Sequence, residues 1–170
     1  MKYNYENLIE FLSESNAIEG VHDPDSLQQA LHAWKFLIES DRLTVGTILK
    51  VHKILMLHSC LKPNEKGYFR EVPVWVGGRE GMEWSKIREA IDHWVMNAND
   101  LINNGKKQNP IFLEDVIKKQ HVEYEKIHPF VDGNGRTGRM FMNWTRMKLG
   151  LPILIIHRGQ EQQEYYKWFK

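Results

Sequence analysis

The sequence predicts a mostly α-helical fold that carries one small β-hairpin. Apolar residues recur every three or four positions along most of the chain, which is the spacing of helices with one buried face. One segment, residues 67–78, instead combines β-branched and aromatic residues between glycines, which is typical of extended structure. The chain has 170 residues and no repeat or long linker, so we expect residues 1–170 to form a single domain.

The individual helices are predicted from apolar stripes and from the residues that start and stop them. Asp23 to Ser26 is a good helix start, and Pro110 suits the first turn of a later helix. The clearest stripe begins at Trp84 and is followed by Asn103 to Gly105, which favours an end there. Gly150 follows another helix as its cap. The predicted ranges are about 8–20, 27–38, 45–55, 84–102, 110–127, 136–149 and 160–169.

The predicted hairpin, residues 67–78, is the one extended element. Pro73 has no N–H to donate to a central ladder, so a strand here belongs at an edge. An isolated hairpin is only marginally stable in water, and this one is expected to lean on the helices. Its free edge can then receive another chain.

Charge and cysteine content exclude several classes of protein. Lysine and arginine number 23 against 22 aspartates and glutamates, so no overall field attracts nucleic acid or an anionic membrane, and we expect neither as a partner. Cys60 is the only cysteine, which excludes an internal disulfide and a multi-cysteine zinc site. The polar start resembles no signal peptide, and the longest aliphatic run, Leu151–Ile156, is too short for a membrane span. We expect a cytoplasmic protein, with export without a cleaved signal left open.

The segment from His128 to Arg139, which reads HPFVDGNGRTGR, carries the side chains best suited to ligand binding and catalysis. Its closely spaced glycines let backbone N–H groups converge on an anion at the start of the next helix. Arg136 and Arg139 are three positions apart and share a helix face that suits phosphate oxygens. Asp132 is a hard oxygen ligand for Mg²⁺, and His128 can accept a proton near neutral pH. Together they predict a nucleoside triphosphate site, without the lysine of a Walker A loop.

Each of these residues also has an ordinary interpretation. A histidine before proline commonly caps or packs, Asp-Gly-Asn-Gly is commonly a surface turn, and two arginines at helical spacing commonly form a solvated face. Phe130 is interpreted as a core anchor. The ordinary interpretations must all hold at once within twelve positions, so phosphate binding is favoured.

The same segment matches the motif of the Fic family of nucleotidyltransferases, HxFx(D/E)GNGRxxR, at every defined position. The lead-in His121–Ile127 also resembles that family, and Gly67–Arg70 with the residues after it resembles the family's target-docking flap. The similarity spans roughly residues 10–168. It implies an all-α Fic core with a β-hairpin flap at residues 67–78.

The resemblance implies a role for each matching residue. His128 resembles the catalytic base, and Asp132 resembles the Mg²⁺ ligand. The residues that resemble the nucleotide-binding set are Gly133, Asn134, Gly135, Arg136, Arg139, Tyr165 and Tyr166. Either tyrosine can instead belong to the core. The residues that resemble the docking flap are Arg70, Val72, Val74, Trp75 and Val76.

The reaction implied by the resemblance is transfer of AMP from ATP to a Ser, Thr or Tyr hydroxyl of a target protein, with this chain itself as one target. Two alternatives stay open. One is transfer of phosphate or another nucleotide moiety; phosphate-transferring relatives have lysine at the position of Gly135, which is glycine here. The other is a non-catalytic module that binds nucleotide or a partner. Assembly into a homo-oligomer is also left open.

Near the N-terminus, Ser15 to Gly20 reads SNAIEG and fits the family's inhibitory pattern (S/T)xxxE(G/N). The ordinary interpretation is a short helix with Gly20 just past its end. The resemblance implies that Glu19 pairs with Arg139 and displaces the γ-phosphate from its productive pose. In some relatives the same glutamate also serves removal of AMP. The remaining histidines, His52 among them, show no ligand spacing and are interpreted as surface or core residues.

Overall fold

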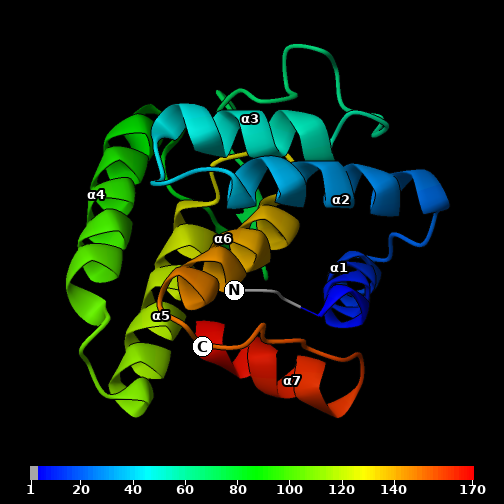
Figure 1. Ribbon diagram of the computed structural model, residues 1–170. Helices are drawn as coiled ribbons and strands as arrows, with labels where there is room; N and C mark the ends of the chain where they lie inside the picture. Colours follow the sequence, from blue (N-terminus) through cyan, green and yellow to red (C-terminus); the bar gives the residue numbers. More distant parts are fainter. Residues whose placement is uncertain (1–3) are drawn as a thin grey trace.

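Helices make up most of residues 4–170, which are the residues that the computed structural model describes (Figure 1). Met1–Tyr3, the first residues of the polar start interpreted above, lie outside the described part. The described chain contains seven α-helices and the two short strands of a hairpin, so the predicted mostly helical class is confirmed. The helices are α1 (Tyr5–Ile18), α2 (Pro24–Ile38), α3 (Val45–Leu55), α4 (Ile87–Gly105), α5 (Pro110–Ile127), α6 (Asn134–Lys148) and α7 (Gln160–Tyr166).

Side-chain caps fix where several helices begin. The carboxylate of Asp23 accepts a hydrogen bond from the backbone N–H of Ser26 at 2.8 Å, as the sequence predicts for the start of α2. Thr44 caps α3 and Asn109 caps α5 in the same way. Because capping depends only on neighbouring residues, these starts agree with the predicted ranges.

Helix α4 departs from its predicted range at both ends. Trp84 lies in a 3₁₀ turn, Trp84–Lys86, and the α-helix proper begins at Ile87. The helix continues through Asn103 and Asn104 to Gly105. Gly105 is buried, and a Cβ built on it would lie 2.9 Å from Leu149. Packing against the neighbouring helices therefore overrides the weak helix preference of the two asparagines.

The hairpin is shorter and later than predicted. Its strands are β1 (Trp75–Val76) and β2 (Arg79–Glu80), which pair antiparallel with Trp75 opposite Glu80. The reversal is made by Gly77 and Gly78, whose φ angles of 56° and 80° are those of a tight hairpin turn. Residues 67–74, predicted as extended, therefore lead into the hairpin rather than form its ladder.

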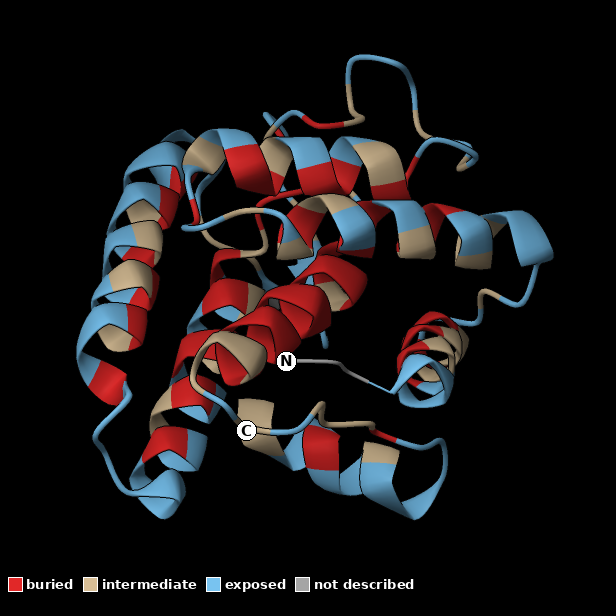
Figure 2. Cartoon of the chain, in the orientation of Figure 1, coloured by how far each residue is buried: buried red, intermediate tan, exposed pale blue. Residues whose placement is uncertain are grey.

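Helix α6 lies in the middle of the fold and contacts α1, α2, α3, α4 and α5 (Figure 1). Twelve of its fifteen residues are buried, and its ribbon is red over almost its whole length in Figure 2. Aromatic side chains, among them Phe141 and Trp144, anchor it in the main core. Its first turn carries buried polar residues, so the predicted anion site is built into the centre of the molecule.

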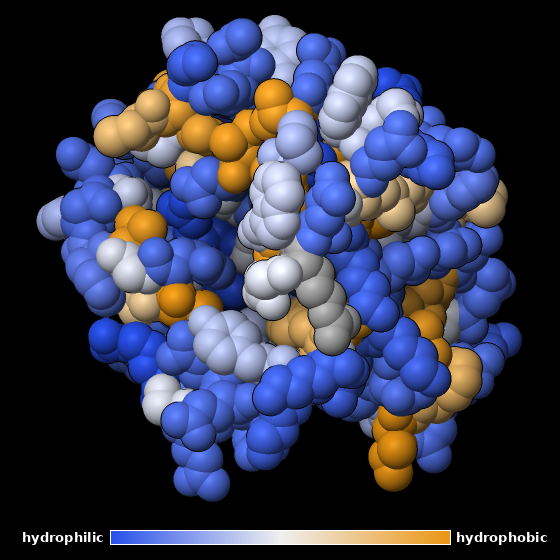
Figure 3. All heavy atoms as spheres, turned by 180° about the vertical axis from the view of Figure 1, so that it is seen from behind, coloured by the Kyte–Doolittle hydropathy of each residue, from blue (hydrophilic) through white to orange (hydrophobic). Residues whose placement is uncertain are grey.

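The face of the molecule seen from behind is mainly hydrophilic (Figure 3). Figure 3 shows the rear face, where hydrophobic residues form separate patches among polar ones. Over residues 4–170, no helix combines the length and apolar character needed to cross a membrane.

Candidate functional site

His128 ends α5 in a left-handed conformation, with φ 49° and ψ 63°. It is the one non-glycine residue in the described chain with positive φ. Pro129 follows it and cannot continue the helix, so the chain turns away here. The Nδ1 atom of the half-buried imidazole lies 3.3 Å from the carbonyl oxygen of Glu125. With Nδ1–H donating there, Nε2 is left as the acceptor. Burial lowers the pKa of His128 below its usual value, which favours the neutral imidazole that a base requires.

Asp132 presents its carboxylate to solvent at the tip of the loop between α5 and α6. Its side chain is 60% exposed, with Oδ2 3.5 Å from a guanidinium nitrogen of Arg136. The Oδ1 atom accepts a hydrogen bond from the backbone N–H of Gly133 at 2.6 Å. Gly133 has φ 83°, and a Cβ built there would lie 2.8 Å from the sulfur of Met56. Glycine is therefore required both by backbone conformation and by space.

The loop is held from behind by His52 of α3 and by Asn134. His52 lies 3.7 Å from Phe130 ring to ring, stacked at an interplanar angle of 5°. The backbone N–H of Gly67 donates to Nδ1 of His52, so Nε2 carries the proton and donates to the carbonyl of Asp132, each at 2.9 Å. Burial lowers the pKa of His52 to about 4, which keeps this arrangement neutral.

Asn134 closes the loop on itself. Its side-chain oxygen accepts from the N–H of Phe130 at 2.8 Å, and its amide nitrogen donates to the carbonyl of Phe130 at 2.9 Å. Asn134 is 2% exposed. The structure therefore gives this side chain a loop-closing role, and its predicted role as a phosphate donor stays a prediction.

Arg136 and Arg139 are buried on one face of α6 but differ in their partners. Arg136 lies 3.5 Å from Asp132 and 3.3 Å from the sulfur of Met56, and its Nε has no hydrogen-bond partner. Arg139 donates to the hydroxyl and carbonyl oxygens of Ser15 at 2.9 Å each. It also donates to Glu19 at 2.7 Å.

The residues of the predicted inhibitory pattern therefore meet Arg139 across the fold. Helix α1 ends at Ile18, Glu19 is its cap, and Gly20 reverses the chain with φ 71°. Glu19 also lies over the start of α6, because a Cβ built on Gly135 would be 2.2 Å from its carboxylate oxygen.

The two predicted tyrosines have different surroundings. Tyr165 is 3% exposed, and its hydroxyl lies 2.9 Å from Nε2 of His121 and 3.3 Å from Arg139. Tyr166 is exposed, and its hydroxyl accepts from Gln162. Tyr165 is therefore a core residue behind Arg139, and Tyr166 is the tyrosine on the surface.

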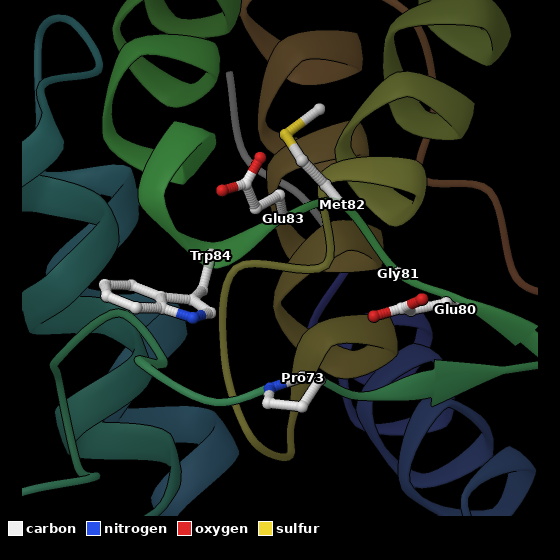
Figure 4. A pocket seen from close by; sticks show the side chains of 6 residues that line it. All are labelled: Pro73, Glu80, Gly81, Met82, Glu83 and Trp84. Atoms are coloured by element: carbon white, nitrogen blue, oxygen red, sulfur yellow. The ribbon is translucent and has the colours of Figure 1, made fainter.

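The predicted flap residues also divide into two groups. Val72, Trp75 and Val76 are exposed, Val74 is half-buried, and Arg70 is fully buried beneath them. A cavity of about 370 Å³ opens beside the hairpin, between the segment before β1, the residues that follow β2 and the 3₁₀ turn that begins at Trp84 (Figure 4). Pro73 lies on one arm and Glu80 on the other, and Trp84 lies on the far side.

Two site residues were missed by sequence reasoning. His52 was interpreted only as a surface or core residue, because its partner Asp132 is 80 positions away. Glu125 lies in the segment before His128 and has a buried carboxylate oxygen without a hydrogen-bond partner. Burial raises its pKa to about 7. No spacing in the sequence indicates that His52 contacts the loop or that Glu125 is buried beside it.

Among the described residues 4–170, no group of three or more His, Cys, Asp or Glu side chains is arranged to hold a metal ion. Asp132 is a solvent-facing hard oxygen donor beside the buried Arg136, which fits Mg²⁺ held jointly by one carboxylate and by phosphate oxygens.

Comparison with known proteins gives consistent matches. A sequence profile of the Fic/DOC family matches residues 42–145. Protein adenylyltransferase Fic of Drosophila grimshawi is 31% identical over 137 residues, which is 79% of this chain and 26% of that protein. The Drosophila mojavensis protein of the same name is 31% identical over 79% of this chain and 25% of its own length. This chain thus spans about a quarter of the length of these relatives.

Solved structures share the fold. A Fic domain containing signaling protein from Bacteroides thetaiotaomicron has a TM-score of 0.77 at 19% identity, covering 95% of this chain and 70% of that one. Fic-1 from C. elegans, residues 134–508, has a TM-score of 0.69 at 21% identity, covering 97% and 55%. The predicted Fic fold is confirmed.

Proposed function

Because the chain belongs to the Fic/DOC family, we propose that it transfers AMP from ATP to a Ser, Thr or Tyr hydroxyl of a target protein, and that Glu19 restrains this activity. Its curated relatives are named as protein adenylyltransferases, and the family is one of nucleotidyltransferase-like enzymes. The observation that carries the proposal is the start of α6, where the buried Arg136 and Arg139 follow directly after the loop that joins His128 to the exposed Asp132.

The start of α6 supports phosphate binding. No side chain caps this helix, so the N–H groups of its first turn are free for an anion. The helix dipole adds positive potential at the same place. The unpartnered Nε of Arg136 is a buried donor that needs an acceptor. The proposed cradle for the phosphates is Gly133, Asn134, Gly135, Arg136 and Arg139. The exposed Tyr166 is the tyrosine proposed to lie toward the adenine ring, while Tyr165 lies in the core behind Arg139.

His128 is the proposed general base. Its Nε2 takes the proton of the target hydroxyl as the hydroxyl oxygen forms a bond to the α-phosphorus of ATP. The bond from that phosphorus to the bridging oxygen breaks, and pyrophosphate leaves. Asp132 is the proposed ligand of Mg²⁺, which when bound neutralises charge on the phosphates. The remaining work of the site is to align the hydroxyl, the phosphorus and the leaving oxygen.

Glu19 is the proposed brake because it competes for the guanidinium of Arg139. Its carboxylate lies 2.7 Å from that guanidinium, a contact that a γ-phosphate would otherwise make. The competition concerns only one end of the nucleotide, so ATP is expected to bind in an unproductive pose rather than be excluded. A second proposed role of Glu19 is in the removal of AMP from a modified target.

The test uses ATP labelled at either the α- or the γ-phosphate, with Mg²⁺. Glu19→Gly is expected to incorporate α-label into protein at least about tenfold faster than wild type, since 1.4 kcal/mol of lost competition corresponds to tenfold. Glu39→Gly is the matched control, because Glu39 also caps a helix, α2, but is exposed and forms no ion pair within the described chain. Adding His128→Ala to Glu19→Gly is expected to abolish labelling.

Three results distinguish the alternatives. Label from the γ-phosphate alone indicates phosphate transfer and contradicts AMP transfer. Nucleotide binding without any label, in Glu19→Gly as well as wild type, favours the binding module. Equal α-labelling by wild type and Glu19→Gly contradicts the brake and leaves the transfer activity in place.

A further inference from the structure

Arg70 is the one buried cation of the segment predicted to form the docking flap. It is 2% exposed. Its Nε donates to the carbonyl of His128 at 2.7 Å, and Nη1 donates to the carbonyl of Val72 at 2.8 Å. Nη2 donates to the carbonyl of Met82 at 2.6 Å and, more weakly, to that of Ile127 at 3.5 Å. Its backbone N–H donates to the carbonyl of Pro129 at 2.9 Å. One residue therefore bonds to both sides of the hairpin and to the end of α5.

Burial of the Arg70 charge without a carboxylate partner in the described chain costs free energy, so its hydrogen bonds must compensate for the lost hydration. Over residues 4–170, no carboxylate forms an ion pair with Arg70, so its charge is compensated only by carbonyl oxygens. Burial lowers the pKa of its guanidinium below the usual value. A lysine has no planar guanidinium with which to donate to these carbonyls in several directions at once.

The positions of these carbonyls show which parts of the chain Arg70 connects. Val72 precedes β1 and Met82 follows β2, so the guanidinium bridges the base of the hairpin. The hairpin is also closed by the N–H of Gly81, which donates to the carbonyl of Val74 at 2.8 Å. The third carbonyl belongs to His128, whose left-handed backbone costs free energy and needs support from its surroundings.

We propose that Arg70 is a positioning residue that locks the hairpin, and with it the docked target hydroxyl, to the backbone of His128. The proposal rests on the function proposed above, in which His128 takes the proton of the target hydroxyl, and on the resemblance of the hairpin segment to the family's target-docking flap. A guanidinium that holds the hairpin and the base in one rigid unit fixes the distance between the incoming oxygen and the imidazole. Loss of the hydrogen bonds made by the Arg70 guanidinium is then expected to slow AMP transfer while the affinity for ATP stays the same.

The electrostatic surroundings of His128 supply a readout that a purely structural role would not move. The charged groups that act on its imidazole are Arg70 from the hairpin side, Glu19 from α1 and Asp132 from the loop. The positive charge of Arg70 lowers the pKa of His128, whereas the two carboxylates raise it. Removal of the Arg70 charge should therefore raise the pKa of His128, and Arg70→Lys should leave it nearly unchanged.

The first experiment needs no activity. Imidazole titration by NMR and amide hydrogen exchange are measured for wild type, Arg70→Lys and Arg70→Gln. We expect faster exchange at the N–H of Gly81 in both variants, and a higher pKa of His128 in Arg70→Gln only. Arg88→Lys is the matched control, because Arg88 is an exposed arginine paired with Asp92 on α4. Unchanged exchange and unchanged titration in both Arg70 variants overturn the proposal.

The second experiment measures transfer in the Glu19→Gly background with α-labelled ATP and the chain's own hydroxyls as acceptors. Arg70→Lys is expected to reduce the rate by about 10- to 100-fold, the scale of a 1 Å misplacement, with the Kd for Mg²⁺-ATP unchanged. An unchanged rate overturns the proposal. If Glu19→Gly itself transfers no AMP, the proposed function fails, and the exchange and titration results still decide whether Arg70 locks the hairpin to His128.

A milder variant covers the case in which the Arg70 variants do not fold. A Cβ at Gly81 would lie 3.2 Å from Nη2 of Arg70 and 3.1 Å from Val74. Gly81→Ala should therefore displace the guanidinium without removing its charge. We expect it to slow transfer and speed exchange in the hairpin, and no effect on either contradicts the proposal.

Discussion

Replacement of Gly135 by alanine should change stability by an amount that depends on Glu19. A Cβ at this position would lie 2.2 Å from the carboxylate of Glu19 and 2.9 Å from a guanidinium nitrogen of Arg139. Both contacts are with the ends of flexible side chains, so the backbone need not move. The carboxylate must move away instead, and it then loses its 2.7 Å hydrogen bond to Arg139.

The size of the effect follows from two opposing contributions. A hydrogen bond between charged groups contributes about 1.5–3 kcal/mol, but the Glu19 side chain is 38% exposed, so we expect about 1 kcal/mol after screening by solvent. Arg139 keeps both bonds to Ser15 and is not left unpaired. Alanine in place of glycine within a helix contributes about 0.5–1 kcal/mol of stability. In wild type the two contributions nearly cancel. With Glu19→Ala the ion pair is already absent, so the gain is opposed only by the 2.9 Å contact with Arg139, which is present in both backgrounds.

The assay is a double-mutant cycle by urea unfolding at neutral pH and low salt. The four proteins are wild type, Gly135→Ala, Glu19→Ala and the double variant. We expect a coupling free energy of about 1 kcal/mol, which corresponds to about 2–4 °C in Tm for a domain of this size. If Gly135→Ala has the same effect in both backgrounds, Glu19 does not occupy the space above Gly135 and the reasoning is refuted.

The other predictions concern acid stability, packing and the metal ligand. Burial lowers the pKa of His52 to about 4 and that of His121 to about 3, so below pH 6.5 these two histidines take up two protons on unfolding. Burial raises the pKa of Glu125 to about 7, so this carboxyl releases one proton on unfolding, and the net uptake is about one proton. The free energy of unfolding should thus fall by about 1.4 kcal/mol per pH unit from pH 6.5 to 4.5, and a flat urea-unfolding profile would contradict these assignments. Gly138→Ala should cost about 1–3 kcal/mol by urea unfolding, because its Cβ would lie 2.3 Å from the buried oxygen of Glu125. Asp132→Ala should blunt the Mg²⁺ dependence of ATP binding in calorimetry, and wild-type titration curves would count against its role as ligand.

Gly46→Ala provides the control for the packing prediction. Gly46 also lies within a helix, α3, but a Cβ there meets only the hydroxyl of Thr44 at an ordinary 3.6 Å. It should gain about 0.5–1 kcal/mol from helix propensity. A loss at Gly46 equal to that at Gly138 would mean that glycine replacement, rather than the contact with Glu125, causes the effect.

Local chemistry explains which parts of the fold could be predicted. Helix starts such as Asp23 depend on neighbouring residues, and α5 agrees with its predicted range because Pro110 and Pro129 bound it. The hairpin was placed too early because the extended propensity of residues 67–74 is a weak signal beside the left-handed pair Gly77 and Gly78.

Contacts between residues far apart in the sequence explain the features of the site that could not be predicted from local sequence. The spacing of Arg136 and Arg139 predicts a shared face, but nothing near them in sequence indicates that they have different partners. The contact between Glu19 and Arg139 joins positions 120 residues apart and was expected only through family resemblance. His52 likewise depends on a contact 80 residues away.

The difference between the two arginines bears on how a brake can act on a nucleotide site. Each of the three guanidinium nitrogens of Arg139 donates a hydrogen bond, to Ser15, Glu19 or Tyr165, whereas Nε of Arg136 is a buried donor without a partner among residues 4–170. A buried cation with an open donor remains favourable for phosphate, because the acceptor it gains replaces none that it already holds. An anion that binds Nη2 of Arg139 must instead displace the carboxylate of Glu19. Competition at one of two neighbouring arginines therefore changes the pose of the phosphates more than their affinity, and this is why transfer and ATP binding should respond differently to Glu19→Gly.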